Sequence, residues 1–308
     1  MNTPHFHLLV LPFVWLPMPV ARAVWNLANI AGIAAAVRLV GFRRVPVRWI
    51  AAGLWCGGGT TLLVICGQVA GLMAVGVAMV WREARVGRWG RAALWVGVLA
   101  ALKPLFGLLV LWFVYERQWR TIVLAGLSCA ACYAIGATVF GVTPYVDWSQ
   151  ALAHAGTDWF GGALNASWRG ITQRVASDTW EPVLRWMGNA VILGATLWHL
   201  RSLSSATRLL AMALAAMLLS PIAWAHYLWM LAGPLTLWLA AGHRWPWGAW
   251  LLWVPPVPIV IFQRAEVAPW GIPSLYAYGL LALWLAVIRS SSRRDVSIES
   301  HLFGSGQV

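Results

Sequence analysis

The sequence contains little charge, and almost none of it is negative or carried by lysine. Charged residues make up 10% of the 308 residues, nine acidic residues stand against 22 basic ones, and Lys103 is the only lysine. Apolar residues account for 61%, and the mean hydropathy is +0.71. A soluble domain of this length cannot bury so much apolar surface. The composition therefore excludes an ordinary soluble protein and predicts an all-α, polytopic bundle of transmembrane helices, each a run of about 20 apolar residues.

Cysteine is also scarce. The four cysteines lie in or beside apolar runs, and Cys129 and Cys132 form a C-x-x-C pair. In a soluble chain such a pair would suggest redox or metal chemistry. Here no further ligand lies nearby, and small residues at helical spacing usually pack helices together. We therefore expect no metal site.

The net charge of +13 comes from arginines that fall in short clusters between apolar runs, at residues 43–48, 82–91, 117–120, 201–208 and 289–294. This distribution is typical of cytoplasmic loops and argues against nucleic-acid binding. It predicts one transmembrane domain over residues 1–289 and a polar cytoplasmic tail over residues 290–308. The long stretch at 142–182 is then an extracytoplasmic loop.

Helix-breaking residues interrupt three of the apolar runs. Glycines 57–59 interrupt 49–81, Lys103-Pro104 interrupts 92–114, and Ser220-Pro221 interrupts 209–242. Each run is predicted to form two short helices whose vertex points outward, although 92–114 could instead be re-entrant or a single tilted helix. Irregular backbone at membrane depth survives where it lines a cavity, so polar residues beside the breaks are candidate site residues.

Three polar side chains lie beside these breaks. A lysine at membrane depth is costly, so Lys103 is predicted to have an anionic partner, a carboxylate or a phosphate, unless it reaches the membrane surface. Gln68 could line the cavity or simply link two helices. His226 follows Ser220-Pro221 and could be either a site residue or a hydrogen-bonded interior histidine.

The outer loop supplies further candidates. It contains four of the nine acidic residues, several aromatic residues and two arginines. Aromatic rings beside carboxylates suit a sugar, and the guanidinium groups could hold phosphate oxygens. The candidate substrate-binding residues of this loop are Asp147, Asp158, Arg169 and Arg174.

Four segments in order resemble glycosyltransferase family 87, the polyprenol-phosphate-dependent membrane mannosyltransferases with the GT-C fold. They are the proline-punctuated stretch at 7–30, residues 67–120 from GQVAGL through AALKPLF to ERQWR, LNASWRGITQRV at 164–175, and LLSPIAWAHYLWML at 218–231. The resemblance covers most of residues 7–240.

This resemblance implies transfer of a hexose, typically mannose, from a polyprenyl phosphate donor to a glycolipid acceptor on the outer face of a bacterial plasma membrane, without a cofactor. It implies His226 as a catalytic residue and Asn165, Trp224 and Gln68 as cavity-lining residues. Lys103 is our assignment as the lipid-phosphate contact.

One feature departs from the family pattern. The family's catalytic base is an aspartate in the first outer loop, which would lie upstream of Met1. We therefore expect a start recorded too late, or a natural truncation that leaves an inactive lipid-binding homologue. Asp147 or Asp158 could serve as a substitute base. A transporter or lipid flippase is the competing class, although no internal repeat is evident.

Overall fold

The computed structural model describes residues 3–41, 58–153, 160–264 and 270–290. Within these ranges the chain is helical and forms no strand, only one isolated β-bridge between Asn165 and Trp224. The prediction of an all-α fold is therefore confirmed. The 290–308 tail lies outside the described residues apart from Ser290.

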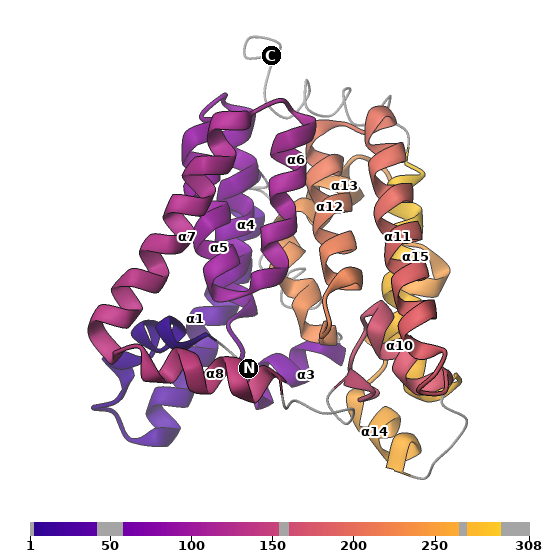
Figure 1. The fold of residues 1–308 in the computed structure, drawn as a ribbon, viewed down its shortest axis with the longest axis horizontal. Helices are drawn as coiled ribbons and strands as arrows, with labels where there is room; N and C mark the ends of the chain where they lie inside the picture. The colour runs from indigo at the N-terminus through magenta and orange to yellow at the C-terminus, as the bar shows by residue number, and fades with distance from the viewer. Residues whose placement is uncertain (1–2, 42–57, 154–159, 265–269, 291–308) are drawn as a thin grey trace.

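The first half of the chain forms a layer of helices on one side of the molecule (Figure 1). Its elements are η1 (Pro4–Leu9), η2 (Leu11–Phe13), α1 (Met18–Leu39), α3 (Gly58–Ile65), α4 (Ala70–Arg85), α5 (Trp89–Leu102), η3 (Pro104–Leu109), α6 (Val110–Tyr115), α7 (Trp119–Phe140) and α8 (Thr143–Ala153). Small residues allow the helices to pack closely, because a Cβ at Gly71 would clash with the Asn29 backbone and one at Gly97 with that of Ala125.

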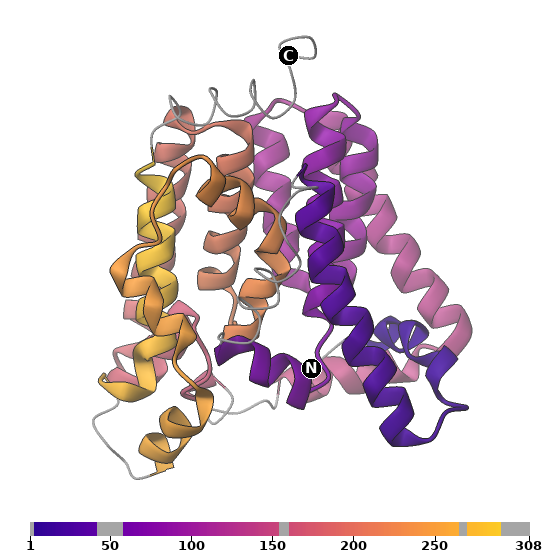
Figure 2. The same ribbon diagram turned by 180° about the vertical axis from the view of Figure 1, so that it is seen from behind.

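The second half of the chain packs beside the first. It comprises α10 (Trp168–Val175), α11 (Glu181–His199), η4 (Leu200–Ser202), α12 (Ser205–Leu219), η5 (Ala225–Leu231), α13 (Ala232–Ala240), η6 (Trp247–Trp253), α14 (Pro256–Arg264), η7 (Ile272–Ser274) and α15 (Leu275–Ile288). Helix α12 is buried from Leu209 to Leu218, because it lies on the side of the second half that faces the first and contacts elements of both (Figure 2). It therefore forms the centre of the apolar core.

Two of the predicted breaks are present. The 92–114 run is an antiparallel hairpin, α5 followed by η3 and α6, with Lys103 extended between its arms. This excludes a single tilted helix. The 209–242 run breaks after α12, where Ser220 is extended and η5 and α13 turn back.

The third predicted break, at glycines 57–59, lies partly outside the described residues. Gly58 and Gly59 are the first residues of α3, and the chain turns at Gly67 after this helix, where a φ of +58° favours glycine. Gly59 provides close packing, since a Cβ there would lie 3.0 Å from the Ala225 carbonyl oxygen. Residues 49–57 lie outside the described residues.

Two helices, α1 and α7, are long and apolar enough to cross a membrane, each with 22 residues. Four further apolar helical segments have 10–17 residues: 89–102, 104–115, 205–219 and 272–288. Helix α7 exposes an apolar stripe of Val123, Leu127, Ile135 and Val139, which is unusual on a surface that faces water.

The arginine-rich loops lie at one end of the bundle. The connections α4–α5, α6–α7 and α11–α12 and the end of α15 are all at the top of Figure 1, whereas α3, α8, α10 and α14 are at the bottom. The top loops carry Arg88, Arg117, Arg201 and Arg289. The arginines at 43, 44, 48, 293 and 294 lie outside the described residues.

Candidate functional site

The breaks at Lys103 and at Ser220 lie at the bottom end of the bundle, opposite the arginine-rich loops (Figure 1). Lys103 takes an extended conformation, with φ −141° and ψ 101°, because the following Pro104 disfavours helical backbone. Its side chain is only 5% exposed. The Lys103 ammonium donates a hydrogen bond to the Tyr227 hydroxyl oxygen at 2.9 Å and lies 4.7 Å from the centroid of that ring.

His226 lies beside the same tyrosine. Its ring centroid is 4.9 Å from that of Tyr227, edge to face, and the side chain is 3% exposed. Among the described residues neither ring nitrogen of His226 has a hydrogen-bond partner. Buried polar groups are nearly always paired, so an unpaired imidazole suggests that a ligand supplies the missing partner.

The structure brings together Lys103 and His226, which the sequence analysis selected, with Tyr227, which it did not consider. The hydroxyl is neutral, so the expected anionic partner of Lys103 is not supplied within the ranges that the structure describes. The ammonium has three N–H groups and gives one to Tyr227. Two remain for an anion. We define Lys103, His226 and Tyr227 as the vertex cluster.

Asn165 fixes the Ser220–Trp224 turn that leads into His226. The Asn165 amide nitrogen donates to the carbonyl oxygens of Phe160 (2.9 Å) and Pro221 (3.0 Å). The amide oxygen accepts from the backbone nitrogens of Ala223 (2.8 Å) and Ser167 (3.1 Å). Every hydrogen-bonding position of this fully buried amide is therefore used by the backbone.

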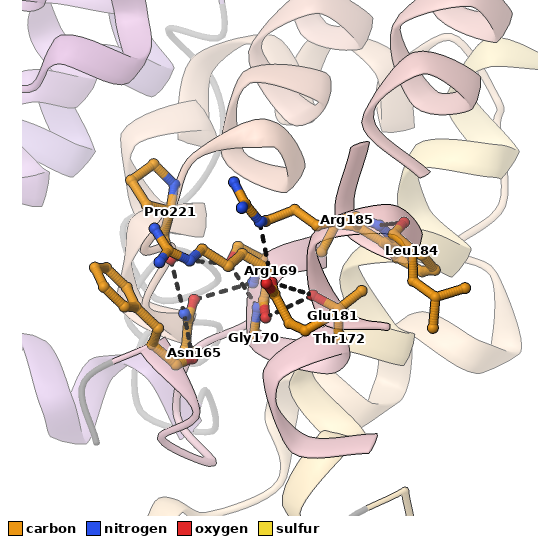
Figure 3. Close-up of polar contacts among 11 residues, drawn as sticks. Asn165, Arg169, Gly170, Thr172, Glu181, Leu184, Arg185 and Pro221 are labelled. Carbon is orange, nitrogen blue, oxygen red and sulfur yellow. Dashed lines mark hydrogen bonds and ion pairs between the residues drawn. The ribbon is translucent and has the colours of Figure 1, made fainter. Parts of the chain in front are cut away.

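Other contacts reinforce this connection. The Ala166 nitrogen donates to the Ala223 carbonyl oxygen at 2.6 Å, and Trp224 forms the isolated β-bridge with Asn165. The Ser167 hydroxyl donates to the Pro221 carbonyl oxygen at 3.3 Å and accepts from the Gly170 nitrogen at 3.1 Å, capping α10. The two motifs found separately in the sequence thus form one structural unit (Figure 3).

Arg174 also supports this unit. Its guanidinium donates to the carbonyl oxygens of Gly162 (2.8 Å) and Asn165 (3.2 Å) and to the Ser274 hydroxyl (3.0 Å). Burial lowers the pKa of Arg174 to about 10, so the group stays cationic at neutral pH. Its contacts are those of a residue that joins the outer loop to the η7 segment.

The remaining candidates are spread over the same end of the molecule. Gln68 follows the turn between α3 and α4, and its buried side-chain oxygen has no partner among the described residues. Asp147 is exposed on α8 and borders a shallow pocket of about 320 Å³, together with His7 and Trp148. Asp158 lies outside the described residues. Arg169 lies on α10, over the ring of Phe160.

The sequence also gave no signal for the contacts of His5. Its Nε2 is 2.8 Å from the carbonyl oxygen of Ala101, and its Nδ1 is 3.2 Å from the Tyr145 hydroxyl. Burial lowers the pKa of His5, outweighing the opposite effect of the Ala101 contact. His5 thereby links η1 and α8 to the end of α5, two residues before Lys103.

Chemically, the vertex cluster offers one cation and one imidazole, both almost fully buried. A cation without a buried counter-ion favours a ligand that brings negative charge, such as a phosphate. The imidazole can exchange hydrogen bonds with hydroxyl groups of the same ligand. This combination suits a sugar phosphate.

Comparison with known proteins identifies the family and its relatives. The family model described as glycosyltransferase family 87 matches residues 1–223. The chain is 25% identical over 304 residues to a polyprenol-phosphate-mannose-dependent α-(1-2)-phosphatidylinositol pentamannoside mannosyltransferase of Mycolicibacterium smegmatis, which covers 91% of this chain and 69% of the relative.

A second relative is the polyprenol-phosphate-mannose-dependent α-(1-2)-phosphatidylinositol mannoside mannosyltransferase of Mycobacterium tuberculosis. It is 28% identical over 165 residues, which are 51% of this chain and 38% of the relative. No solved structure matches the chain. Because the family model covers well over half of the sequence, the chain belongs to glycosyltransferase family 87.

Proposed function

We propose that the protein is a multi-pass membrane enzyme that transfers a hexose from a polyprenyl phosphate donor to a glycolipid acceptor. Mannose is the first candidate for this hexose. The reaction takes place at the extracytoplasmic face of a bacterial plasma membrane and needs no cofactor. Family membership and the names of two mannosyltransferase relatives support the reaction class. The exposed apolar stripe of α7 and the one-sided arginine loops support the membrane setting and its orientation.

The vertex cluster is the observation that carries the proposal. It lies at the end of the bundle opposite the arginine-rich loops, which is the extracytoplasmic end under the positive-inside rule. Lys103 contributes positive charge, held in place by the Tyr227 hydroxyl. The donor phosphate would accept the two remaining N–H groups of Lys103. The hexose beside it would reach the imidazole of His226.

The chemical step is a displacement at the anomeric carbon. An acceptor hydroxyl oxygen forms the new carbon–oxygen bond while the bond from the anomeric carbon to the phosphate oxygen breaks. The electron pair of that bond leaves with the lipid phosphate, where the Lys103 ammonium stabilises the developing charge. The acceptor proton passes to a carboxylate, and Asp147 is a candidate because it is exposed at the same end of the bundle.

Transfer of radiolabelled mannose tests this function directly. Membranes that contain the full chain should move label from polyprenyl phosphate mannose to a glycolipid, and His226→Ala should abolish the transfer. His199→Ala is the matched control. His199 is the last residue of α11, at the end of the bundle opposite the vertex cluster, so its replacement should leave activity unchanged.

Two results would contradict the proposal. In the first, the correctly inserted chain transfers no label from any polyprenyl phosphate hexose. In the second, the chain moves the intact donor across the membrane without forming a glycosidic bond, which would make it a transporter. Wild-type turnover by His226→Ala would remove His226 from the site.

A further inference from the structure

A second cationic site lies where α10 meets the start of α11, apart from the vertex cluster. Glu181 is buried, and a single oxygen of its carboxylate accepts hydrogen bonds from the Thr172 hydroxyl (3.1 Å) and from Arg185 Nε (3.0 Å). The Trp168 indole nitrogen donates to the Leu184 carbonyl oxygen at 3.0 Å and holds the two helices together. Figure 3 shows this network around Arg169 and Arg185.

Arg169 does not pair with the Glu181 carboxylate, which is neutralised by Arg185. Its guanidinium carbon lies 3.5 Å from the centroid of the Phe160 ring, and it forms no ion pair within the described ranges. Its Nε is buried without a hydrogen-bond partner there. Burial and the neighbouring charge of Arg185 both lower the pKa of Arg169, against a smaller opposite effect of Glu181. Glu181 therefore pairs with Arg185, and the charge of Arg169 is left without a partner carboxylate within the described ranges.

This excess of positive charge is unusual at its position. Arginine is normally enriched in cytoplasmic loops, and here Arg169 and Arg185 lie at the opposite end from those loops. Stacking on Phe160 leaves the edge of the Arg169 guanidinium available for hydrogen bonds. Paired guanidinium groups of this kind suit the oxygens of a phosphate.

The adjoining surface of α11 is apolar. Over the first turns of this helix Val183, Leu184, Met187 and Val191 are exposed, and Trp186 is 65% exposed. Exposed apolar side chains of this kind suit contact with acyl chains. A lipid whose chains lie along α11 would bring its headgroup to the level of the α10–α11 contact. A phosphate that belongs to a lipid therefore fits both observations.

We propose that Arg169 and Arg185 bind the phosphate of an anionic phospholipid whose chains lie along α11. Asn165 lies four residues before Arg169 and fixes the turn that carries His226, so the bound headgroup would be close to the vertex cluster. The lipid would then be the anchor of the acceptor. This last role rests on the proposed function, whereas binding of the lipid itself does not.

The site can be tested without measuring transfer. The full chain is reconstituted in phosphatidylcholine nanodiscs that contain phosphatidylinositol, and bound lipid is measured by native mass spectrometry. Arg169→Gln should weaken retention of phosphatidylinositol about tenfold, the expected effect of losing one charge-assisted contact. Arg169→Lys, which keeps the charge but loses the planar fork, should give an intermediate loss.

A matched control comes from the other end of α11. Arg201 also stacks on an aromatic ring, 5.0 Å from the centroid of Trp198, but it lies in the cytoplasmic arginine cluster. Arg201→Gln should leave retention of phosphatidylinositol unchanged. Within the described ranges the Arg169 side chain forms no hydrogen bond or ion pair and stacks on the Phe160 ring, so Arg169→Gln should also leave the thermal unfolding temperature unchanged.

The outcomes separate the possible ligands. Equal retention by wild type and Arg169→Gln would overturn the proposal. Displacement of phosphatidylinositol by millimolar inorganic phosphate would also overturn it, because the site would then recognise a free anion. If the lipid binds through Arg169 but no hexose is transferred, the proposed function fails while the lipid site stands.

Discussion

At the scale of single residues, the contact between Lys103 and Tyr227 has a testable consequence. Methionine keeps the length and apolar volume of Lys103 and removes its charge, so Lys103→Met should raise KM for the polyprenyl phosphate donor by about tenfold or more. The protein should not become less stable, because a buried cation without a counter-ion is lost. Steady-state kinetics and a thermal melt check both expectations, and an unchanged KM would show that Lys103 does not contact the donor.

Asn165 allows an isosteric test of positioning. In Asn165→Asp a carboxylate oxygen replaces the amide nitrogen and faces the carbonyl oxygens of Phe160 and Pro221. Loss of two buried hydrogen bonds should destabilise the protein by about 2 kcal/mol or more. The turn before His226 should also loosen, lowering kcat more than it raises KM.

The matched control for this change is Asn189→Asp on the partly exposed side of α11. It should alter neither the melting temperature nor kcat. If Asn165→Asp behaves like the control, Asn165 does not hold the turn. If it changes only KM for a substrate, Asn165 lines the substrate cavity, as the sequence resemblance implies, rather than holding the turn.

At the scale of elements, the hairpin at 89–115 shows how a short segment can span the same distance as a longer one. The 14 residues of α5 rise about 21 Å at 1.5 Å per residue. Twelve α-helical residues would rise only about 18 Å, but six of those in the second arm form η3, at about 2.0 Å each. The two arms therefore match in length.

Pro104 sets the vertex of this hairpin. In Pro104→Ala the residue before it is no longer kept out of helical conformation, so α5 can extend through Lys103 and turn its ammonium away from Tyr227. Transfer activity should fall about tenfold or more while membrane insertion is kept. Pro182→Ala, in the first turn of α11, is the control and should be active. Full activity of Pro104→Ala would show that the proline does not position Lys103.

The breaks also show which elements the sequence could predict. A proline cannot continue a helix, so the vertices at Pro104 and Pro221 were predictable from single residues. Glycine is ambiguous because it serves either a turn or close packing. Gly59 packs against Ala225, whereas Gly67 makes the turn with its positive φ, and only the tertiary contacts distinguish these roles.

At the scale of the whole molecule, the composition predicted the helical class and the basic clusters predicted which loops lie together. The site itself depends on contacts between distant segments. Lys103 meets Tyr227 across 124 positions and Asn165 meets Ala223 across 58. No periodicity within a segment encodes such pairs, so the sequence offered Lys103 and His226 as candidates but could not indicate their contact with Tyr227 or the contacts of the Asn165 amide.

The orientation of the molecule in the membrane can be tested across one helix. Asp178 precedes α11 and Ser202 follows it, and both are exposed. With the four native cysteines replaced by alanine, Asp178→Cys should react with a membrane-impermeant maleimide in intact spheroplasts, and Ser202→Cys should react only after lysis. The reason is that the arginines at 201 and 208 favour the cytoplasmic side. Because only α11 separates the two sites, equal labelling would show that this 19-residue helix does not cross the membrane, and reversed labelling would place the vertex cluster on the cytoplasmic face.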